Sequence, residues 1–185
     1  DDEAAARLLS AAADPQLSTA LQRTTLSALG EGLARRRTTI GKTVASLSDS
    51  ATRRRIARLF VTATETARNK QANTPNRVTA AALLAFADYK LASPALGSLL
   101  SPQTPQTVQV AAISALSERT ESQVGPLLLA SWTQYSPAIR KEVVDAMLRR
   151  VERTNTLLKA IDAGTVKRSE ISRDKQQLLS NHPND

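Results

Sequence analysis

The sequence predicts an all-α protein built from stacked pairs of helices. Three prolines, Pro75, Pro105 and Pro137, each open an apolar-periodic run, and they lie 30 and 32 residues apart. A fixed period of roughly 20 to 50 residues is typical of stacked repeat proteins. Aromatic residues make up only 3% of the chain while Ala and Leu are abundant, which suits closely packed helices. No segment shows the alternation of apolar and polar residues that predicts a strand.

The composition limits the classes of site that these 185 residues can carry. The chain has no cysteine, which excludes disulfides, cysteine-ligated zinc, iron–sulfur clusters and covalent haem attachment within this sequence. The single histidine, His182, excludes a histidine-cluster metal site. No apolar run approaches the roughly 18 residues of a membrane-spanning helix. Because the chain begins at Asp1 without methionine, we expect it to be a piece of a longer protein.

The first two helices are predicted from Ala- and Leu-rich periodic segments. Residues 1–13 form the first, which the Asp14-Pro15 step ends because the residue before proline leaves helical geometry. We expect Pro15 to open another repeat. The second helix is predicted over 17–33, with Gly30 and Gly32 marking its fraying end.

Two further helices are predicted before the regular repeats begin. A short one is expected over 40–47, and a longer one over 51–69, with residues 48–50 as candidate caps. The longer helix carries one apolar stripe. Its members are Ile56, Leu59, Phe60, Ala63 and Ala67.

The clearest repeats are predicted over 74–103, 104–135 and 136–164. Each has a proline in the first turn of its first helix, where the missing N–H loses no partner. The apolar stripes after the first two prolines match position for position, and after the third only the first position differs. The predicted stripes are Val78, Ala81, Ala82, Ala85 and Phe86; Val108, Ala111, Ala112, Ala115 and Leu116; and Arg140, Val143, Val144, Met147 and Leu148.

A shorter second helix is expected in each repeat, over 94–100, 123–135 and 154–163. Gly164 ends the last of these, and one more helix is predicted over 169–179. A pair of helices cannot bury both of its faces alone, so neighbouring pairs must stack. We therefore expect a right-handed α-α superhelix of HEAT- or armadillo-like repeats that forms a single domain over residues 1–185.

Three stretches of the sequence resemble a known family: Leu99 to Ala112, Ser131 to Arg140, and Leu178 to Pro183. They are similar to the HEAT-like repeat region of secreted multi-domain dehydrogenase and cytochrome c (haem-binding) proteins of planctomycete and verrucomicrobial bacteria. The resemblance covers residues 50–185. It implies a non-catalytic scaffold or protein-interaction domain in an extracytoplasmic location, periplasmic or secreted, with neighbouring domains of the same chain as partners.

The resemblance carries over no functional residue and no cofactor. Haem attachment in that family needs a Cys-x-x-Cys-His motif, which this cysteine-free chain lacks. A haem would therefore lie in a neighbouring domain of the parent protein. We expect no enzyme activity in this segment, no small-molecule substrate and no insertion into a membrane.

Several motifs that could carry chemistry have simpler interpretations. Gly41-Lys42-Thr43 resembles the end of a phosphate-binding P-loop, but Arg36 replaces the first glycine of that motif and no strand precedes it. His182, before a proline, could be a metal or haem ligand, and we expect a turn or helix-start residue instead. Trp132 and Tyr135 could form a stacking platform, although aromatic residues at helical spacing usually fill a core.

Two pairs of carboxylates each share one helix face, Glu118 with Glu121 and Glu142 with Asp145. Acid–base catalysis would need a cleft that raises one pKa. Both pairs lie among polar or basic residues, so we expect solvated faces. Asp145 aligns with Ile113 of the preceding repeat, which offers a place at an interface as the alternative.

The net charge of +8 makes a second function worth testing, a basic HEAT-like module that binds nucleic acid or another polyanion. Acidic residues are interspersed with the basic ones and aromatic residues are few, so a solvated surface is preferred and nucleic acid is not the expected partner. The residues that could contact a polyanion or a protein partner are Arg35, Arg36, Arg37, Arg53, Arg54, Arg149 and Arg150.

Overall fold

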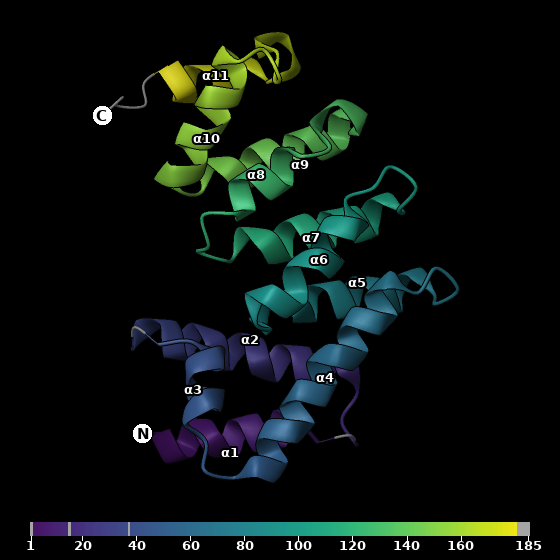
Figure 1. The fold of residues 1–185 in the computed structure, drawn as a ribbon, viewed down its shortest axis with the longest axis vertical. Helices are drawn as coiled ribbons and strands as arrows, with labels where there is room; N and C mark the ends of the chain where they lie inside the picture. The colour runs from purple at the N-terminus through teal and green to yellow at the C-terminus, as the bar shows by residue number, and fades with distance from the viewer. Residues whose placement is uncertain (1, 15, 37, 181–185) are drawn as a thin grey trace. The chain divides into compact units, whose positions relative to one another are not determined.

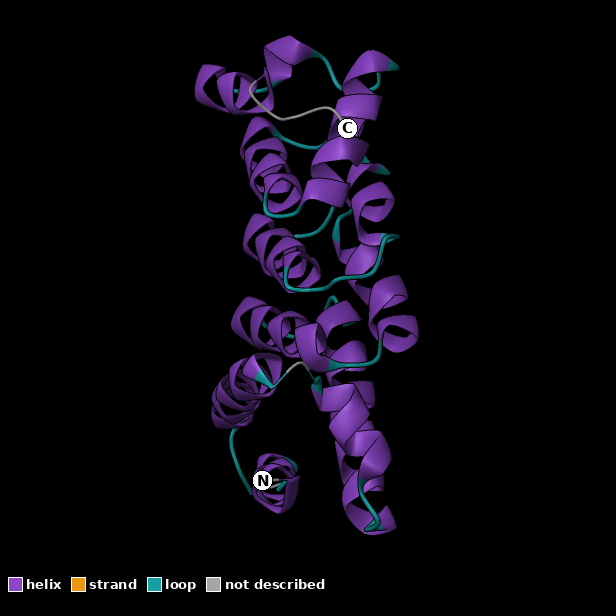
Figure 2. Ribbon diagram, turned by 90° about the vertical axis from the view of Figure 1, so that its left-hand side faces the viewer, coloured by secondary structure: helices purple, strands orange, loops and turns teal. Residues whose placement is uncertain are grey.

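The computed structural model describes residues 2–14, 16–36 and 38–180 of the chain. Within these ranges every regular element is a helix and no strand occurs (Figure 2), which confirms the all-α prediction. The chain divides into two compact units, Asp1–Leu96 and Gly97–Asp185. The prediction of a single domain stays a prediction, and the two units are described separately.

The first unit packs its helices around a core of leucines. Helix α1 contacts α2, α3 and α4, and α5 contacts α2 and α4 (Figure 1). Leu9, Leu26, Ile56, Leu83 and Leu84 are among its fully buried side chains. The elements are α1 (Asp2–Ala12), α2 (Thr19–Arg35), α3 (Ile40–Ser46), α4 (Ser50–Arg68), α5 (Thr74–Leu83), the 3₁₀ helix η1 (Leu84–Phe86) and most of α6 (Tyr89–Leu99).

Helix α4 forms as its sequence predicts. Asp49, one of the candidate caps, is the N-cap, and its carboxylate accepts hydrogen bonds from the backbone N–H groups of Ala51 at 2.9 Å and Thr52 at 3.1 Å. These bonds satisfy two of the N–H groups that a helix start leaves unpaired. Four residues of the predicted stripe are buried and Leu59 is half-buried. The buried members are Ile56, Phe60, Ala63 and Ala67.

One expectation for the first unit is wrong and another is not tested. Helix α2 does not fray at Gly30 and Gly32 but continues to Arg35. A Cβ on Gly30 would lie 3.1 Å from the Phe86 ring, so the glycine permits a close approach inside the helix and does not end it. Pro15, which was expected to open a repeat, lies outside the described residues.

The stripe predicted after Pro75 is confirmed only at Ala81, which is buried, because Val78, Ala82, Ala85 and Phe86 are only half-buried. Helix α5 packs against two helices and turns a different set of side chains inward. The buried residues are Arg77, Ala80, Ala81 and Leu83, followed by Leu84 in η1. A rule that places apolar residues inside could not anticipate a buried arginine.

The second unit brings equivalent helices of successive pairs side by side. Helix α7 contacts α9, and α8 contacts α10 (Figure 1). The three prolines lie at helix starts as predicted: Pro105 is the N-cap of α7, Pro137 the first residue of α9, and Pro75 the second residue of α5. The elements are α7 (Gln106–Ser117), α8 (Val124–Leu129), η2 (Trp132–Gln134), α9 (Pro137–Leu148), α10 (Val151–Asp162), η3 (Arg168–Glu170) and α11 (Arg173–Ser180).

The second unit departs from the predicted bounds at the shorter helices. Helix α6 begins five residues before the predicted start at 94 and keeps Pro94 inside it, and α8 ends at Leu129 with a 3₁₀ helix after it. Gly164 follows the end of α10 with a φ of 75°, a conformation that glycine adopts without steric cost. In the predicted stripes, Ala111, Arg140 and Leu148 are half-buried and the remaining members of α7 and α9 are buried.

Candidate functional site

Five helices carry a polar side chain at their fourth residue, and each bonds to a backbone carbonyl near the end of the preceding helix or 3₁₀ helix. Helix ends leave carbonyls without intrahelical partners, and these side chains supply donors to such groups. The carbonyls of Asp14, Ser101, Trp132 and Arg168 also accept a backbone N–H, so for them the side chain adds a second bond. The bonds run from Gln22 to Asp14 (3.0 Å), Arg77 to Ala67 (3.0 Å), Gln109 to Leu100 and Ser101 (3.3 and 2.8 Å), Arg140 to Trp132 (3.2 Å), and Gln176 to Arg168 and Ile171 (2.9 and 2.7 Å).

These polar residues were missed by the apolar-stripe pattern. Gln22, Arg77 and Gln109 are buried, whereas a periodicity rule places polar residues outside. The signal was present in the spacing, because the last four members are 32, 31 and 36 residues apart. Each of these bonds ties a helix to carbonyls of the segment that precedes it.

Trp132 and Tyr135 are core residues, with 1% and 4% of their surface exposed, as expected. The Trp132 indole N–H donates to Glu170 at 2.8 Å, and Arg140 donates to the other oxygen of the same carboxylate at 2.6 Å. The Arg140 guanidinium also lies 5.5 Å from the centre of the Trp132 ring, within the range of a cation–π contact. The Trp132 hydrogen bond, followed by a backbone bond from Lys167 and the charge of Arg140, lowers the pKa of Glu170.

Three of the four carboxylates that were considered for acid–base chemistry, those of Glu118, Glu121 and Asp145, pair with cations. Glu118 pairs with Arg149 at 2.9 Å, and Asp145 pairs with Lys175 at 2.7 Å. The second pair joins α9 to α11, which matches the interface alternative for Asp145. The hydrogen bond from Lys175 to Asp145 raises the pKa of the lysine.

The remaining carboxylate of the first pair, Glu121, lies 3.2 Å from Arg119. The other motifs also lie in ordinary helical surroundings. Gly41-Lys42-Thr43 falls within the first turn of α3, after the N-cap Thr39. His182 lies outside the described residues. The part of the chain that the structure describes contains no group of three or more side chains that could hold a metal ion, and none of its helices is both long and apolar enough to cross a membrane.

The seven arginines expected to contact a partner lie in separate places along the chain. Arg35 ends α2 and Arg36 follows it, and both are exposed. Arg37 lies outside the described residues. In the second unit, Arg149 and Arg150 form the corner between α9 and α10, where Arg149 is paired with Glu118 and Arg150 is half-buried.

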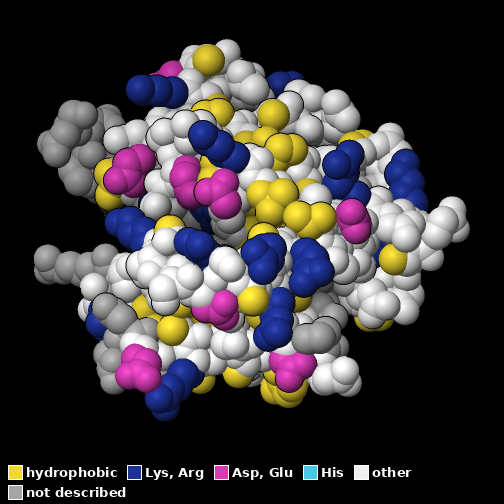
Figure 3. Space-filling model, turned by 60° about the horizontal axis from the view of Figure 1, so that its bottom comes forward, with side chains coloured by type: hydrophobic (Ala, Val, Ile, Leu, Met, Phe, Trp, Pro, Cys, Tyr) yellow, Lys and Arg dark blue, Asp and Glu magenta, His cyan; other side chains and the backbone are white. Residues whose placement is uncertain are grey.

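The remaining two arginines belong to a basic group on α4. Arg53, Arg54, Arg55 and Arg58 are all exposed, and no ion pair joins any of them to a described carboxylate. Arg54 donates one long hydrogen bond, 3.4 Å, to the Ser50 hydroxyl. The face drawn in Figure 3 shows Lys and Arg side chains beside acidic and hydrophobic ones. The surface is therefore mixed, with a local excess of positive charge on α4.

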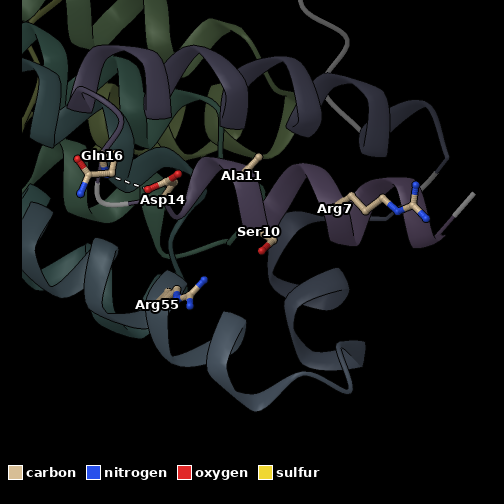
Figure 4. A pocket seen from close by; sticks show the side chains of 6 residues that line it. All are labelled: Arg7, Ser10, Ala11, Asp14, Gln16 and Arg55. Carbon is tan, nitrogen blue, oxygen red and sulfur yellow. Dashed lines mark hydrogen bonds between the residues drawn. The ribbon is translucent and has the colours of Figure 1, made fainter.

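A hollow of about 580 Å³ lies beside this basic group, between α1 and α4. Figure 4 shows Arg55 projecting from α4 toward α1, with Ser10 pointing from α1 into the same space. Asp14 at one end accepts a hydrogen bond from the Gln16 backbone N–H at 2.9 Å, and Arg7 at the other end pairs with Glu3 at 2.7 Å. The Arg55 guanidinium, which no ion pair joins to a described carboxylate, thus offers donors in this hollow for a carboxylate or phosphate oxygen.

No family model, curated protein or solved structure matches the chain. The function must therefore be inferred from the two features described above, the recurring polar contacts and the basic group on α4.

Proposed function

We propose that this chain is a non-catalytic helical-repeat scaffold that binds other proteins. The observation that carries the proposal is the polar side chain at the fourth residue of α2, α5, α7, α9 and α11. The last four of these residues are 32, 31 and 36 positions apart. A contact that recurs at such a spacing is typical of chains built from one supersecondary unit repeated. We propose further that the helix pairs continue as a HEAT-like right-handed α-α superhelix.

The packing of the second unit supports this interpretation. Helix α7 lies on α9 and α8 lies on α10, so helices of the same kind form successive layers. Stacks of this type present long rows of exposed helix surface, and repeat proteins use such surfaces for binding. The protein partner is best sought among neighbouring domains of a longer parent chain, because the resemblance of residues 50–185 suggests a secreted, redox-associated parent.

The scaffold proposal is tested by reconstitution. The chain is used as bait in an extract of its source, and each captured protein is then purified and mixed with the chain at known concentration. We expect a stoichiometric complex with a dissociation constant below about 10 μM, measured by calorimetry, as is usual for specific protein pairs. If separately expressed neighbouring domains and all captured proteins fail to form such a complex, the proposal is wrong.

A second candidate function, polyanion binding, is favoured by the four exposed arginines of α4 that lack ion pairs. Binding through phosphate contacts falls steeply as salt rises. A labelled DNA duplex that the chain does not retain at about 50 mM salt would exclude this function, because phosphate contacts are strongest there.

A further inference from the structure

One line of side chains runs along the exposed side of α4. Arg54, Arg58, Val61 and Glu65 are separated by four, three and four residues, so they lie above one another on the helix surface. All four are exposed, and Val61 keeps 44% of its surface in solvent. They lie opposite the buried stripe that includes Ile56. We call this line the α4 ridge, and along the chain it reads basic, basic, apolar, acidic.

The basic end of the α4 ridge is electrostatically unfavourable in the free protein. Arg54 and Arg58 are one turn apart, and like charges at this spacing destabilise a helix. The nearby carboxylate of Asp49 is already used by the cap of α4. Carboxylates supplied by a partner would relieve this repulsion.

The other end of the α4 ridge decides between two classes of partner. A nucleic acid carries negative charge along its whole length, and Glu65 would repel it one turn beyond Val61. Val61 itself offers an apolar contact, which a phosphate backbone cannot use. A protein segment can instead alternate charge and apolar side chains at the same spacing, as helices in charged interfaces do.

We propose that the α4 ridge docks a helix of a protein partner that carries two carboxylates one turn apart, then an apolar side chain, then a lysine or arginine. The carboxylates pair with Arg54 and Arg58, whose planar guanidinium groups suit two-point binding. The apolar side chain covers Val61, and the basic one pairs with Glu65. This inference rests on the proposed scaffold function and names the chemistry of one partner surface.

The probe is a labelled helical peptide on an alanine and glutamine background. It carries two glutamates one turn apart, then a leucine and a lysine at the spacing of the ridge. A peptide of the same composition with the charged positions shuffled is the control. Fluorescence anisotropy with the full chain should show at least about fivefold tighter binding of the matched peptide, since each exposed pair contributes a small factor. Equal binding of both peptides, or no binding at about 1 mM chain, overturns the proposal.

Charge reversal in the chain tests whether Arg54 and Arg58 carry the binding. R54E/R58E should weaken the matched peptide about tenfold, as two attractions become repulsions. The matched control is K42E/K90E, which changes the net charge equally at exposed lysines in the first turns of α3 and α6 of the same unit and should leave binding within about twofold. Circular dichroism of each variant checks that it remains folded.

The substitution Glu65→Lys should change the affinity for an acidic protein helix and the affinity for a nucleic acid in opposite directions. It should weaken the matched peptide and strengthen binding of a DNA duplex, because it extends the basic line of the ridge. A Glu65→Lys variant that binds DNA more weakly, or the matched peptide more tightly, contradicts the proposal.

If R54E/R58E still binds a captured protein partner with unchanged affinity, the α4 ridge is excluded while the scaffold function stands. If the unaltered chain binds the matched peptide but neither captured proteins nor separately expressed neighbouring domains form a complex with it, the scaffold function fails while the chemical preference of the ridge stands.

Discussion

The indole N–H of Trp132 donates a hydrogen bond of 2.8 Å to Glu170, a residue 38 positions later in the chain. The same carboxylate accepts a bond of 2.6 Å from Arg140. One acidic residue of η3 therefore satisfies the buried indole that precedes α9 and an arginine within α9. A buried Trp usually needs a partner for its N–H, and here that partner also fixes the segment before α11.

Glu170→Gln should lower the free energy of unfolding by about 1 to 2 kcal/mol, because hydrogen bonds to a charged group are stronger than those to a neutral amide. Urea denaturation followed by circular dichroism measures the change. Asp162→Asn is the control. Asp162 is the exposed last residue of α10, and its substitution removes the same charge. Equal effects of the two substitutions would show that the Trp132–Glu170 contact contributes no stability.

The same contact makes stability depend on pH. The hydrogen bond from Trp132 lowers the pKa of Glu170 below its ordinary value of 4.5 in the folded chain. The ionised form is therefore favoured by folding, and its contribution is present above pH 4.5 and is lost as pH falls through the folded pKa. We expect the difference in unfolding free energy between the unaltered chain and Glu170→Gln to shrink as pH falls below 4.5. A difference that grows in this range would contradict the assignment.

Gln109→Ala tests the recurring polar contact. Gln109 is 5% exposed and donates to the Leu100 and Ser101 carbonyls. Its loss removes the side-chain donor to the carbonyl of the buried Leu100, whereas the Ser101 carbonyl keeps a bond from the Thr104 N–H. We expect a cost of about 1 to 3 kcal/mol. The control is Gln106→Ala, an exposed glutamine at the first position of the same helix. Chemical denaturation compares the two variants, and similar values would refute a structural role for the contact.

Two glycines of α2 should respond differently to the same substitution. No atom lies within 4 Å of the Cβ that Gly32→Ala would add, so this variant should gain about 1 kcal/mol in helix propensity. At Gly30 the added Cβ would lie 3.1 Å from the Phe86 ring, so we expect the gain to be lost. Thermal unfolding measures both, and Gly30→Ala as stable as Gly32→Ala would show that the Phe86 ring moves aside freely.

The helices and many of their starts were predictable because local rules determine them. Proline presets φ and lacks an N–H, so Pro75, Pro105 and Pro137 could be placed at helix starts from the sequence alone. Asp49 as the cap of α4 follows from the same kind of local chemistry. The role of Gly30 inside α2 was not predictable, because it depends on the close approach of the Phe86 ring, which is far away in the chain.

The buried polar residues and the candidate site needed the tertiary structure. Arg77 is buried because a carbonyl of α4 lies within reach, and a sequence pattern does not contain that proximity. Exposure of Arg53 and Arg54 was predictable, since both lie off the apolar stripe of α4. That their group lacks ion pairs and lies beside a hollow against α1 follows only from the packing of the two helices.

Arg153 provides the strongest test of polar burial in the second unit. It is 4% exposed, and its guanidinium donates to the Ser117 carbonyl at 2.9 Å and to the Arg119 carbonyl, at the end of α7. Arg153→Met keeps much of the side-chain volume but removes every donor, so we expect a loss of about 2 to 4 kcal/mol in unfolding free energy.

The control for Arg153→Met is Arg168→Met, because Arg168 is exposed in η3 and its loss should change stability by less than about 0.5 kcal/mol. Native-state hydrogen exchange adds a local readout, since amides near residues 117–119 should lose more protection than those of α11 if the carbonyl bonds hold the end of α7. Uniform loss of protection across the unit would instead indicate that Arg153 acts through general packing, and equal stability of the two variants would show that the buried bonds contribute nothing.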